Sequence, residues 1–408
     1  MKDADMRSYA NLILSSVALQ PDQSLLIKAE PAHWPFITVL SELAYKRGAR
    51  YVHVRADHAD LYRSRVENSP PEHLAHVPEW HDLENRTMID EGWALISIKS
   101  PEDPDSLRDL DPTRHGMVQK AQAEANMEFR RATQASKLRW IVVAYPTEKW
   151  AAKVLRTDPS PAASDELWAA MRSILLLDRD DPAAAWHEQS RRLKARQDQL
   201  DALELTALRF SGPGTHLRVG LSDRSRWIGG GDVAADGISF LPNLPTAEVF
   251  TTPDCRATEG RVAMTRPVQI LGTIVVGGWL EFAEGRVVDS GADQGGEILA
   301  RYLELDGRAR YLGELALVDT ASPIYQSGLV FYNTLYDENA ACHIALGSSY
   351  PKCIVGADQM SDEEYQAAGG NRSTVHTDVM ISSPEVDVAG ETRSGADVEI
   401  IKAGSFVI

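Results

Sequence analysis

The first half of the chain alternates short apolar runs with segments of helical composition. Residues 24–30 (SLLIKAE) predict a buried strand, and the residues that follow (PFITVLSELAYKRGA) predict a helix. Further apolar runs predict strands at 50–57, 93–100 and 139–146, while residues 114–137 have the Ala, Gln and Glu content of a helix. Strands that alternate with helices are typical of a parallel α/β sheet. No GxGxxG motif follows these strands, so a Rossmann-like scaffold here need not hold a dinucleotide.

The pattern changes near the middle of the chain. A loop at 157–165 (TDPSPAASD) precedes a charged stretch, WHEQSRRLKARQDQLDALELTALRF, that predicts a long helix joining two halves. After Gly212, short apolar runs separated by Gly, Asp and Asn predict a mainly antiparallel sheet. The sequence therefore predicts a mixed α/β plus α+β protein, with a Rossmann-like parallel α/β domain at 1–210 and a β-rich domain at 211–408.

Composition and charge narrow the class of protein. A chain of 408 residues with 43% hydrophobic and 25% charged residues can bury two cores. The net charge of −17 would repel phosphate backbones, which argues against nucleic acid as a partner. The N-terminal residues lack a signal-peptide pattern, and no apolar run approaches the roughly 18 residues of a membrane span. Three cysteines without paired spacing fit a reducing compartment, so we expect a cytoplasmic protein with no membrane partner.

The segment 375–382 (VHTDVMIS) carries one candidate pair of metal ligands. In a strand, alternate side chains share a face, so His376 and Asp378 would project together from the face opposite the apolar residues. An imidazole beside a carboxylate on a rigid strand suits a divalent metal. A solvated surface pair would show the same pattern.

Two glutamates lie in other predicted strands. Glu314 is the lone acid of LGELALVD, and burial of such a carboxylate is costly unless it is paired or bound to metal. A solvated glutamate on an edge strand is the alternative. Glu259 lies at the mouth of the strand in RATEGRVAMT and is weak evidence by itself.

The stretch 337–347 (DENAACHIALG) predicts a helix of small residues that ends at its glycine. Glu338 and His343 are five positions apart, which does not place them on one helical stripe. A glutamate in the first turn could still converge with the histidine on one ion, and Tyr350 follows just downstream. A core helix with two incidental polar residues remains the alternative.

Other candidate sites are weaker. The histidine clusters HVRADHAD and EHLAHVPEWHD lie in polar stretches of the first domain, which favours solvated or structural roles. No GxSxG motif supports serine catalysis, and the cysteines are too few for a structural zinc site. The remaining candidates all fall in the second domain. A carboxylate-rich set with two histidines suits a pair of divalent ions that share a bridging carboxylate.

Four segments resemble, in order and spacing, the thermophilic-type metalloaminopeptidases: ATEG, LGELAL, GLVFYNTLYDENAACHIALG and STVHTDVMIS. The resemblance is specific from about Leu241 to the C-terminus, whereas in the first domain only length and layout agree. It implies an enzyme that uses two divalent ions to remove the N-terminal residue from peptides with a free N-terminus. A carboxylate-rich site accepts zinc, cobalt, manganese or magnesium. The resemblance also implies a homodimer. The implied metal ligands are Glu259, Glu314, Glu338, His343, His376 and Asp378.

The resemblance also suggests catalytic roles. Tyr350 would line the centre and stabilise the tetrahedral oxyanion, and Glu314 or Glu338 would carry a proton to the leaving amine. One alternative is a ring-cleaving dioxygenase on the same fold, whose single iron would be held by His343, His376 and Asp378. A non-catalytic binding or scaffold protein is the second alternative.

Overall fold

The computed structural model describes residues 1–107 and 109–408, and the chain divides into two compact units. Unit 1 comprises Met1–His187 and Gly231–Pro245, and unit 2 comprises Glu188–Gly230 and Thr246–Ile408. The units thus differ from a simple division at residue 210. Most of helix α9 (Pro182–Ala202) belongs to unit 2 because its Leu193 and Leu200 are buried in the core of that unit.

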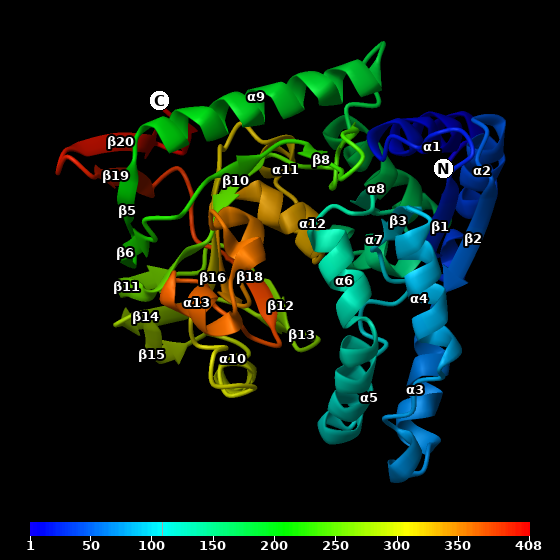
Figure 1. The fold of residues 1–408 in the computed structure, drawn as a ribbon, viewed down its shortest axis with the longest axis horizontal. Helices are drawn as coiled ribbons and strands as arrows, with labels where there is room; N and C mark the ends of the chain where they lie inside the picture. The colour runs from blue at the N-terminus through cyan, green and yellow to red at the C-terminus, as the bar shows by residue number, and fades with distance from the viewer. Residues whose placement is uncertain (108) are drawn as a thin grey trace. The chain divides into compact units, whose positions relative to one another are not determined.

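Unit 1 is built on a parallel sheet with the strand order β2-β1-β3-β4 (Figure 1). The alternation of strands and helices predicted from the sequence is confirmed, and helices α4 and α6 place Met88 and Phe129 against Leu26 and Leu95 of the sheet. The strands are β1 (Ser24–Ala29), β2 (Tyr51–Ala56), β3 (Ala94–Ile98) and β4 (Trp140–Val143), with a small pair, β8 (Asp232–Val233) and β9 (Ser239–Phe240). The helices are α1 (Asp3–Ser16), α2 (Trp34–Lys46), α3 (Ala59–Asn68), α4 (Trp80–Asp90), α5 (Pro112–Ala125), α6 (Met127–Gln134), α7 (Glu148–Leu155) and α8 (Pro161–Ile174).

Unit 2 contains two larger antiparallel sheets, as the glycine-punctuated pattern predicted. The eight-stranded sheet has the order β15-β14-β11-β6-β5-β19-β20-β21, and the five-stranded sheet has the order β18-β17-β16-β10-β7. The strands of the larger sheet are β5 (Leu205–Gly212), β6 (Thr215–Leu221), β11 (Pro253–Ala263), β14 (Trp279–Ala283), β15 (Arg286–Gly291), β19 (Asp387–Thr392), β20 (Asp397–Lys402) and β21 (Ser405–Phe406). Those of the smaller sheet are β7 (Ile228–Gly229), β10 (Glu248–Thr251), β16 (Leu312–Val318), β17 (His343–Gly347) and β18 (His376–Met380). A hairpin, β12 (Val268–Ile270) and β13 (Thr273–Val275), and helices α10 (Gly296–Tyr302), α11 (Pro323–Gln326), α12 (Thr334–Asp337) and α13 (Asp362–Ala367) complete the unit.

The two sheets of unit 2 share one apolar core. Leu208 and Val219 of the larger sheet are buried in the same cluster as Leu315, Leu317 and Ile344 of the smaller one. Because side chains alternate along a strand, the residues between these apolar positions point to the other face of the five-stranded sheet. That second face carries the polar residues described below.

The charged helix predicted from the sequence is shorter in the structure. The charged helix was expected to reach Phe210, but α9 ends at Ala202 and Leu205 begins strand β5. Strand β5 pairs on one edge with β6 and on the other with β19, and this pairing overrides the helical composition of the segment.

None of the helices in the described part of the chain carries an apolar stretch long enough to cross a bilayer.

Candidate metal centre

Four adjacent strands direct polar side chains to one face of the five-stranded sheet. In the antiparallel register, Glu314 on β16 lies opposite Ala345 on β17, which in turn lies opposite Asp378 on β18. His343 on β17 lies opposite Ala316 on β16. Directly opposed residues of antiparallel strands share a face, so these polar residues and the two alanines form one surface.

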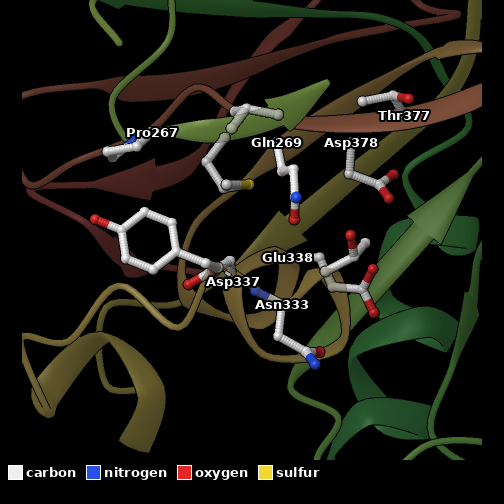
Figure 2. Close-up of a pocket in the computed structure, with 11 residues that line it drawn as sticks. Pro267, Gln269, Asn333, Asp337, Glu338, Thr377 and Asp378 are labelled. Carbon is white, nitrogen blue, oxygen red and sulfur yellow. Dashed lines mark hydrogen bonds between the residues drawn. The ribbon is translucent and has the colours of Figure 1, made fainter. Parts of the chain in front are cut away.

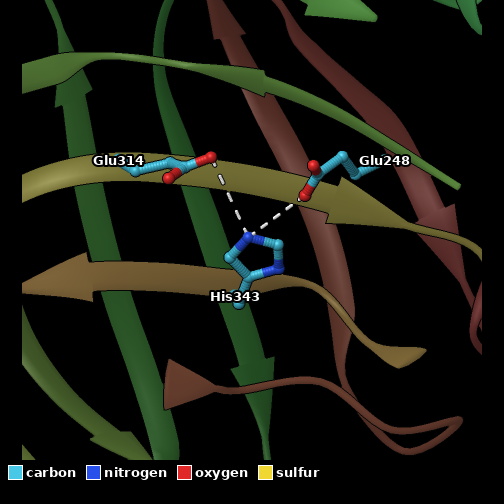
Figure 3. Close-up of side chains that lie close together, drawn as sticks. All are labelled: Glu248, Glu314 and His343. Carbon is cyan, nitrogen blue, oxygen red and sulfur yellow. Dashed lines mark ion pairs between the residues drawn. The ribbon is translucent and has the colours of Figure 1, made fainter. Parts of the chain in front are cut away.

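Glu314 lies between two histidines. Its Oε1 is 3.9 Å from Nε2 of His343, and its Oε2 is 3.3 Å from Nε2 of His376. Glu248 on β10 approaches from the other side, with Oε2 3.3 Å from Nε2 of His343 (Figure 3). Asp378 Oδ1 lies 3.3 Å from Nε2 of His376. One carboxylate therefore joins two groups of potential ligands.

Backbone carbonyls fix the orientation of both imidazoles. Nδ1 of His376 lies 2.7 Å from the oxygen of Ser348, and Nδ1 of His343 lies 3.2 Å from the oxygen of Ala341. Each Nδ1–H donates to its carbonyl, so in the neutral ring the lone pair of Nε2 faces the carboxylates. A second hydrogen bond of this kind is the usual support of a metal-binding histidine.

The cluster is short of positive charge. Burial, together with the neighbouring carboxylates of Glu314 and Asp378, raises the pKa of Glu248 to about 8. Burial also raises the pKa of Glu338 well above its usual value, and the carboxylates of Glu248 and Asp378 add to this effect. These carboxyl groups take up protons because the site lacks enough cations to hold them ionised.

His376 and Asp378 stabilise each other's charged forms. Burial opposes protonation of His376, but Asp378 and Glu314 outweigh it and raise the pKa of that imidazole well above its usual value. Burial likewise opposes ionisation of Asp378, yet the adjacent His376 holds the pKa of this carboxyl below its usual value. Protons on these side chains supply positive charge to the cluster, and a bound cation would supply positive charge in their place.

The residues present fit a pair of divalent ions. Two overlapping groups place ligand atoms within 4.8 Å of one another: Glu248, Glu314 and His343, and Glu314, His376 and Asp378. Ligand atoms 2.0–2.1 Å from a tetrahedral zinc lie roughly 3.3 Å apart, which matches the shortest separations in both groups. Oε2 of Glu248 and Oδ1 of Asp378 are buried without a hydrogen-bond partner, so each has a lone pair to give to a metal.

The structure brings most of the predicted site residues together. Glu314, His343, His376 and Asp378 form the two groups, and Glu338, at the start of the 3-10 turn Glu338–Ala340, lies beside them as a wall of the same pocket as Asp378. The hydroxyl of Tyr350 lies 3.5 Å from Nε2 of His376.

Glu259 does not join them. It is exposed on β11 of the eight-stranded sheet, where its Oε1 accepts a hydrogen bond from the backbone N–H of Glu284 at 2.7 Å. Its face of that sheet is solvated, whereas the metal groups are buried on the other sheet. Glu248 occupies the place expected of Glu259. An acid at the start of the apolar strand AEVF was the signal in the sequence, and it matches the pattern that singled out Glu314.

The segment DENAACHIALG is not the predicted helix. Helix α12 ends at Asp337, and residues from His343 form strand β17, which pairs with β16 and β18. All five residues of this strand are buried, so pairing on both edges overrides the helix propensity of its alanine and leucine. Gly347 ends the strand with φ +105°, and a Cβ there would lie 2.1 Å from the oxygen of Val375.

Three of the candidate histidines of unit 1 have structural partners instead. His53 pairs with Glu84 at 3.1 Å, Nε2 of His81 lies 3.0 Å from Oδ1 of Asn126, and His58 accepts the N–H of Asp60 at the start of α3. Within the described residues, none of them belongs to a group of three potential metal ligands.

Known proteins similar to this chain include metallopeptidases. Residues 2–406 match the family described as thermophilic metalloprotease (M29). Aminopeptidase 2 of Geobacillus stearothermophilus is 36% identical over 405 residues, which cover 99% of this chain and 98% of that protein. Aminopeptidase T of Thermus aquaticus is 38% identical over 390 residues, or 96% and 95% of the two chains. The solved structure of wild-type AmpT from Thermus thermophilus superposes with a TM-score of 0.92 at 35% identity and covers 99% of each chain.

Proposed function

We propose that this chain, which belongs to the thermophilic metalloprotease family (M29), hydrolyses the first peptide bond of its substrates at a centre of two divalent ions. The family and its relatives make it a metal-dependent aminopeptidase, an exopeptidase of the hydrolase class that acts on peptides. The number of ions is our inference. The observation that carries it is the position of Glu314, whose two oxygens face different histidines.

Each ion has its own ligand group in this proposal. Glu248, Glu314 and His343 would hold one ion, and Glu314, His376 and Asp378 would hold the other, with Glu314 as the bridge. Glu338, which lines the same pocket as Asp378, would be a further ligand. Imidazole and carboxylate ligands in this proportion suit zinc, cobalt or manganese, with magnesium a poorer match because it prefers oxygen alone.

When bound, such ions polarise the scissile carbonyl and lower the pKa of a water molecule. The residues of the chain supply the remaining steps. Glu314, which belongs to both ligand groups, would hold the group of His343 and the group of His376 in fixed positions relative to each other. Glu338 stands outside the two close groups and lines the pocket beside them, a position that suits a proton carrier: one of its oxygens would take the proton of the attacking water and pass it to the leaving amine nitrogen.

Tyr350 would stabilise the oxyanion. Burial and the carboxylates of Glu314 and Asp378 raise the pKa of its phenol well above the usual value, so the hydroxyl keeps its proton. A neutral hydroxyl at the edge of the site donates a hydrogen bond to negative charge that develops on the carbonyl oxygen. The ring is held against Phe250 and His376, with centroids 5.4 and 5.2 Å away.

The centre also offers a reason for action at the N-terminus. The free α-amine of a peptide would bind a metal or a carboxylate of the centre. An internal peptide bond offers no such amine.

The test is digestion of defined peptides by the protein reconstituted with zinc, cobalt or manganese, followed by mass spectrometry. We expect stepwise loss of single N-terminal residues, its abolition by a chelator, and close to two ions per chain by elemental analysis. N-terminally acetylated peptides are the matched control and should remain intact. One iron per chain, or cleavage of acetylated peptides at internal bonds, would overturn the proposal. The relatives are aminopeptidases, so neither the dioxygenase nor the scaffold alternative is favoured.

We also propose a homodimer in a reducing compartment. The dimer is supported by the family resemblance and the compartment by three free, buried cysteines. Light scattering coupled to size-exclusion chromatography would report a mass of one chain if the dimer is wrong.

A further inference from the structure

A pocket opens directly beside the candidate metal centre. Its walls come from β12, from residues 332–338 and from β18, and Glu338 and Asp378 both line it (Figure 2). Since these two carboxylates also belong to the centre or adjoin it, a group in this pocket would lie next to the reacting bond.

Two carboxylates on the pocket wall are already engaged. Asp337 accepts hydrogen bonds from the backbone N–H groups of Phe331 and Asn333, at 2.8 and 3.0 Å, and so holds the wall in place. Asp378 faces His376 in the metal centre. Asp337 and Asp378 are therefore not free to pair with a charged side chain deep in the pocket.

The rest of the lining is neutral. Val268 and Met380 are apolar, whereas Gln269 and Thr334 offer an amide and a hydroxyl. No lysine, arginine or histidine lies among the described residues that line it. The lining would offer an acidic side chain three carboxyl groups (Asp337, Glu338 and Asp378) and no positively charged side chain, so acidic groups are disfavoured.

Gln269 is the lining residue best placed to contact a substrate. It is the central residue of β12, its side chain is exposed, and in Figure 2 its amide points into the pocket toward Glu338. The amide has no hydrogen-bond partner among the described residues, so it can donate to or accept from a ligand without breaking a bond within the protein.

We propose that this pocket receives the side chain of the substrate's N-terminal residue, that it selects uncharged side chains against acidic ones, and that Gln269 is a specificity-determining residue. The inference rests on the proposed aminopeptidase function. A site that removes one residue at a time needs to accommodate only one side chain on the amino side of the scissile bond. The pocket bounded by Glu338 and Asp378 adjoins the candidate centre.

The test compares kcat/KM for three substrates that share a leaving group and differ in the N-terminal residue: leucine, arginine and glutamate. For the unaltered protein we expect glutamate to be the poorest by about 100-fold. Gln269→Glu should raise the arginine-to-leucine ratio about tenfold, because it places a carboxylate in the pocket. Gln269→Lys should raise the glutamate-to-leucine ratio by a similar factor.

Gln199→Glu is the matched control. Gln199 is exposed on α9 and does not line the pocket, and its substitution makes the same change of charge as Gln269→Glu. The arginine-to-leucine and glutamate-to-leucine ratios of kcat/KM in this variant should stay within twofold of those of the unaltered protein. Efficient release of glutamate by the unaltered protein, or unchanged ratios in active, metal-loaded Gln269 variants, would overturn the pocket assignment alone. Failure of the unaltered protein to release any N-terminal residue would instead reject the proposed function.

Discussion

Oε2 of Glu248 lies 3.3 Å from Nε2 of His343, although strand β16 separates their two strands in the sheet. His343 lies opposite Ala316 of that strand, and Glu248 lies opposite Val318, two residues further along the same face. The methyl group of Ala316 leaves room above the sheet, and a larger side chain there would separate the acid from the imidazole. The contact places Glu248 among the candidate ligands, where the sequence had suggested Glu259.

The presence of Glu248, and not Glu259, among the candidate ligands leads to two linked predictions. We expect Glu248→Gln to lower metal affinity by about 10–100-fold or more, because an amide replaces a charged ligand. Glu259→Gln removes only a surface hydrogen bond to the backbone of Glu284, so its metal content and kcat/KM should match the parent within about twofold. Elemental analysis after dialysis and steady-state kinetics check both variants. The reverse pattern would restore Glu259 as the ligand.

Ala345 offers a test of the space between the two halves of the site. It lies opposite both Glu314 and Asp378 on the face that carries the ligands. Ala345→Val suits a strand but adds two methyl groups where these carboxylates converge, and overpacking of this kind costs about 1–3 kcal/mol. We expect the variant to fold and to lose one equivalent of metal, with kcat at least tenfold lower. Full metal occupancy with parental kcat would show that the face has spare room.

Replacement of Tyr350 by phenylalanine tests the oxyanion role. Loss of one positioned donor typically lowers kcat by 10²–10³ while leaving ground-state binding intact. Tyr350→Phe should therefore reduce kcat by that factor with KM and metal content unchanged. Tyr51→Phe, at an exposed position of unit 1, is the control and should have no effect. A Tyr350→Phe enzyme with normal kcat would exclude the hydroxyl from catalysis.

His33 of unit 1 predicts a dependence of stability on pH. Burial lowers the pKa of this imidazole to about 4, against about 6.5 for an exposed histidine. Its Nδ1 accepts the N–H of Glu30 at 3.1 Å, so a proton on Nδ1 would face another donor. Between pH 6.5 and 4 the unfolded chain binds the proton and the folded chain does not. The stability contributed by neutral His33 is therefore present above pH 6.5 and is lost as the pH falls toward 4.

The measurement is urea unfolding, followed by a probe in unit 1, at pH 7.5 and pH 4.5. The loss of free energy of unfolding attributable to His33 should be roughly 2–3 kcal/mol. His33→Gln lacks the titration, so the difference in stability between parent and variant should shrink by about that amount at pH 4.5. A difference that does not change with pH would contradict the depressed pKa.

The alternation of residues within single segments was enough to predict much of this protein. Apolar runs separated by helical stretches predicted the parallel sheet of unit 1. In the same way, the alternation around Glu314 and in VHTDVMIS predicted that these acids and His376 project away from the core. These features are local, because strand geometry alone decides which residues share a face.

Only the tertiary structure decided which faces and which strands meet. Strand β17 forms from a helix-prone segment because it pairs on both edges, and the pairing of β10 with β16 brings Glu248 to the site in place of Glu259. The division into units depends on where Leu193 and Leu200 are buried. Pairing and burial join residues that are far apart along the chain, so their free energy is absent from any short window of sequence. The sequence alone predicted the types of candidate ligand, and the register of the five-stranded sheet determined which of them converge.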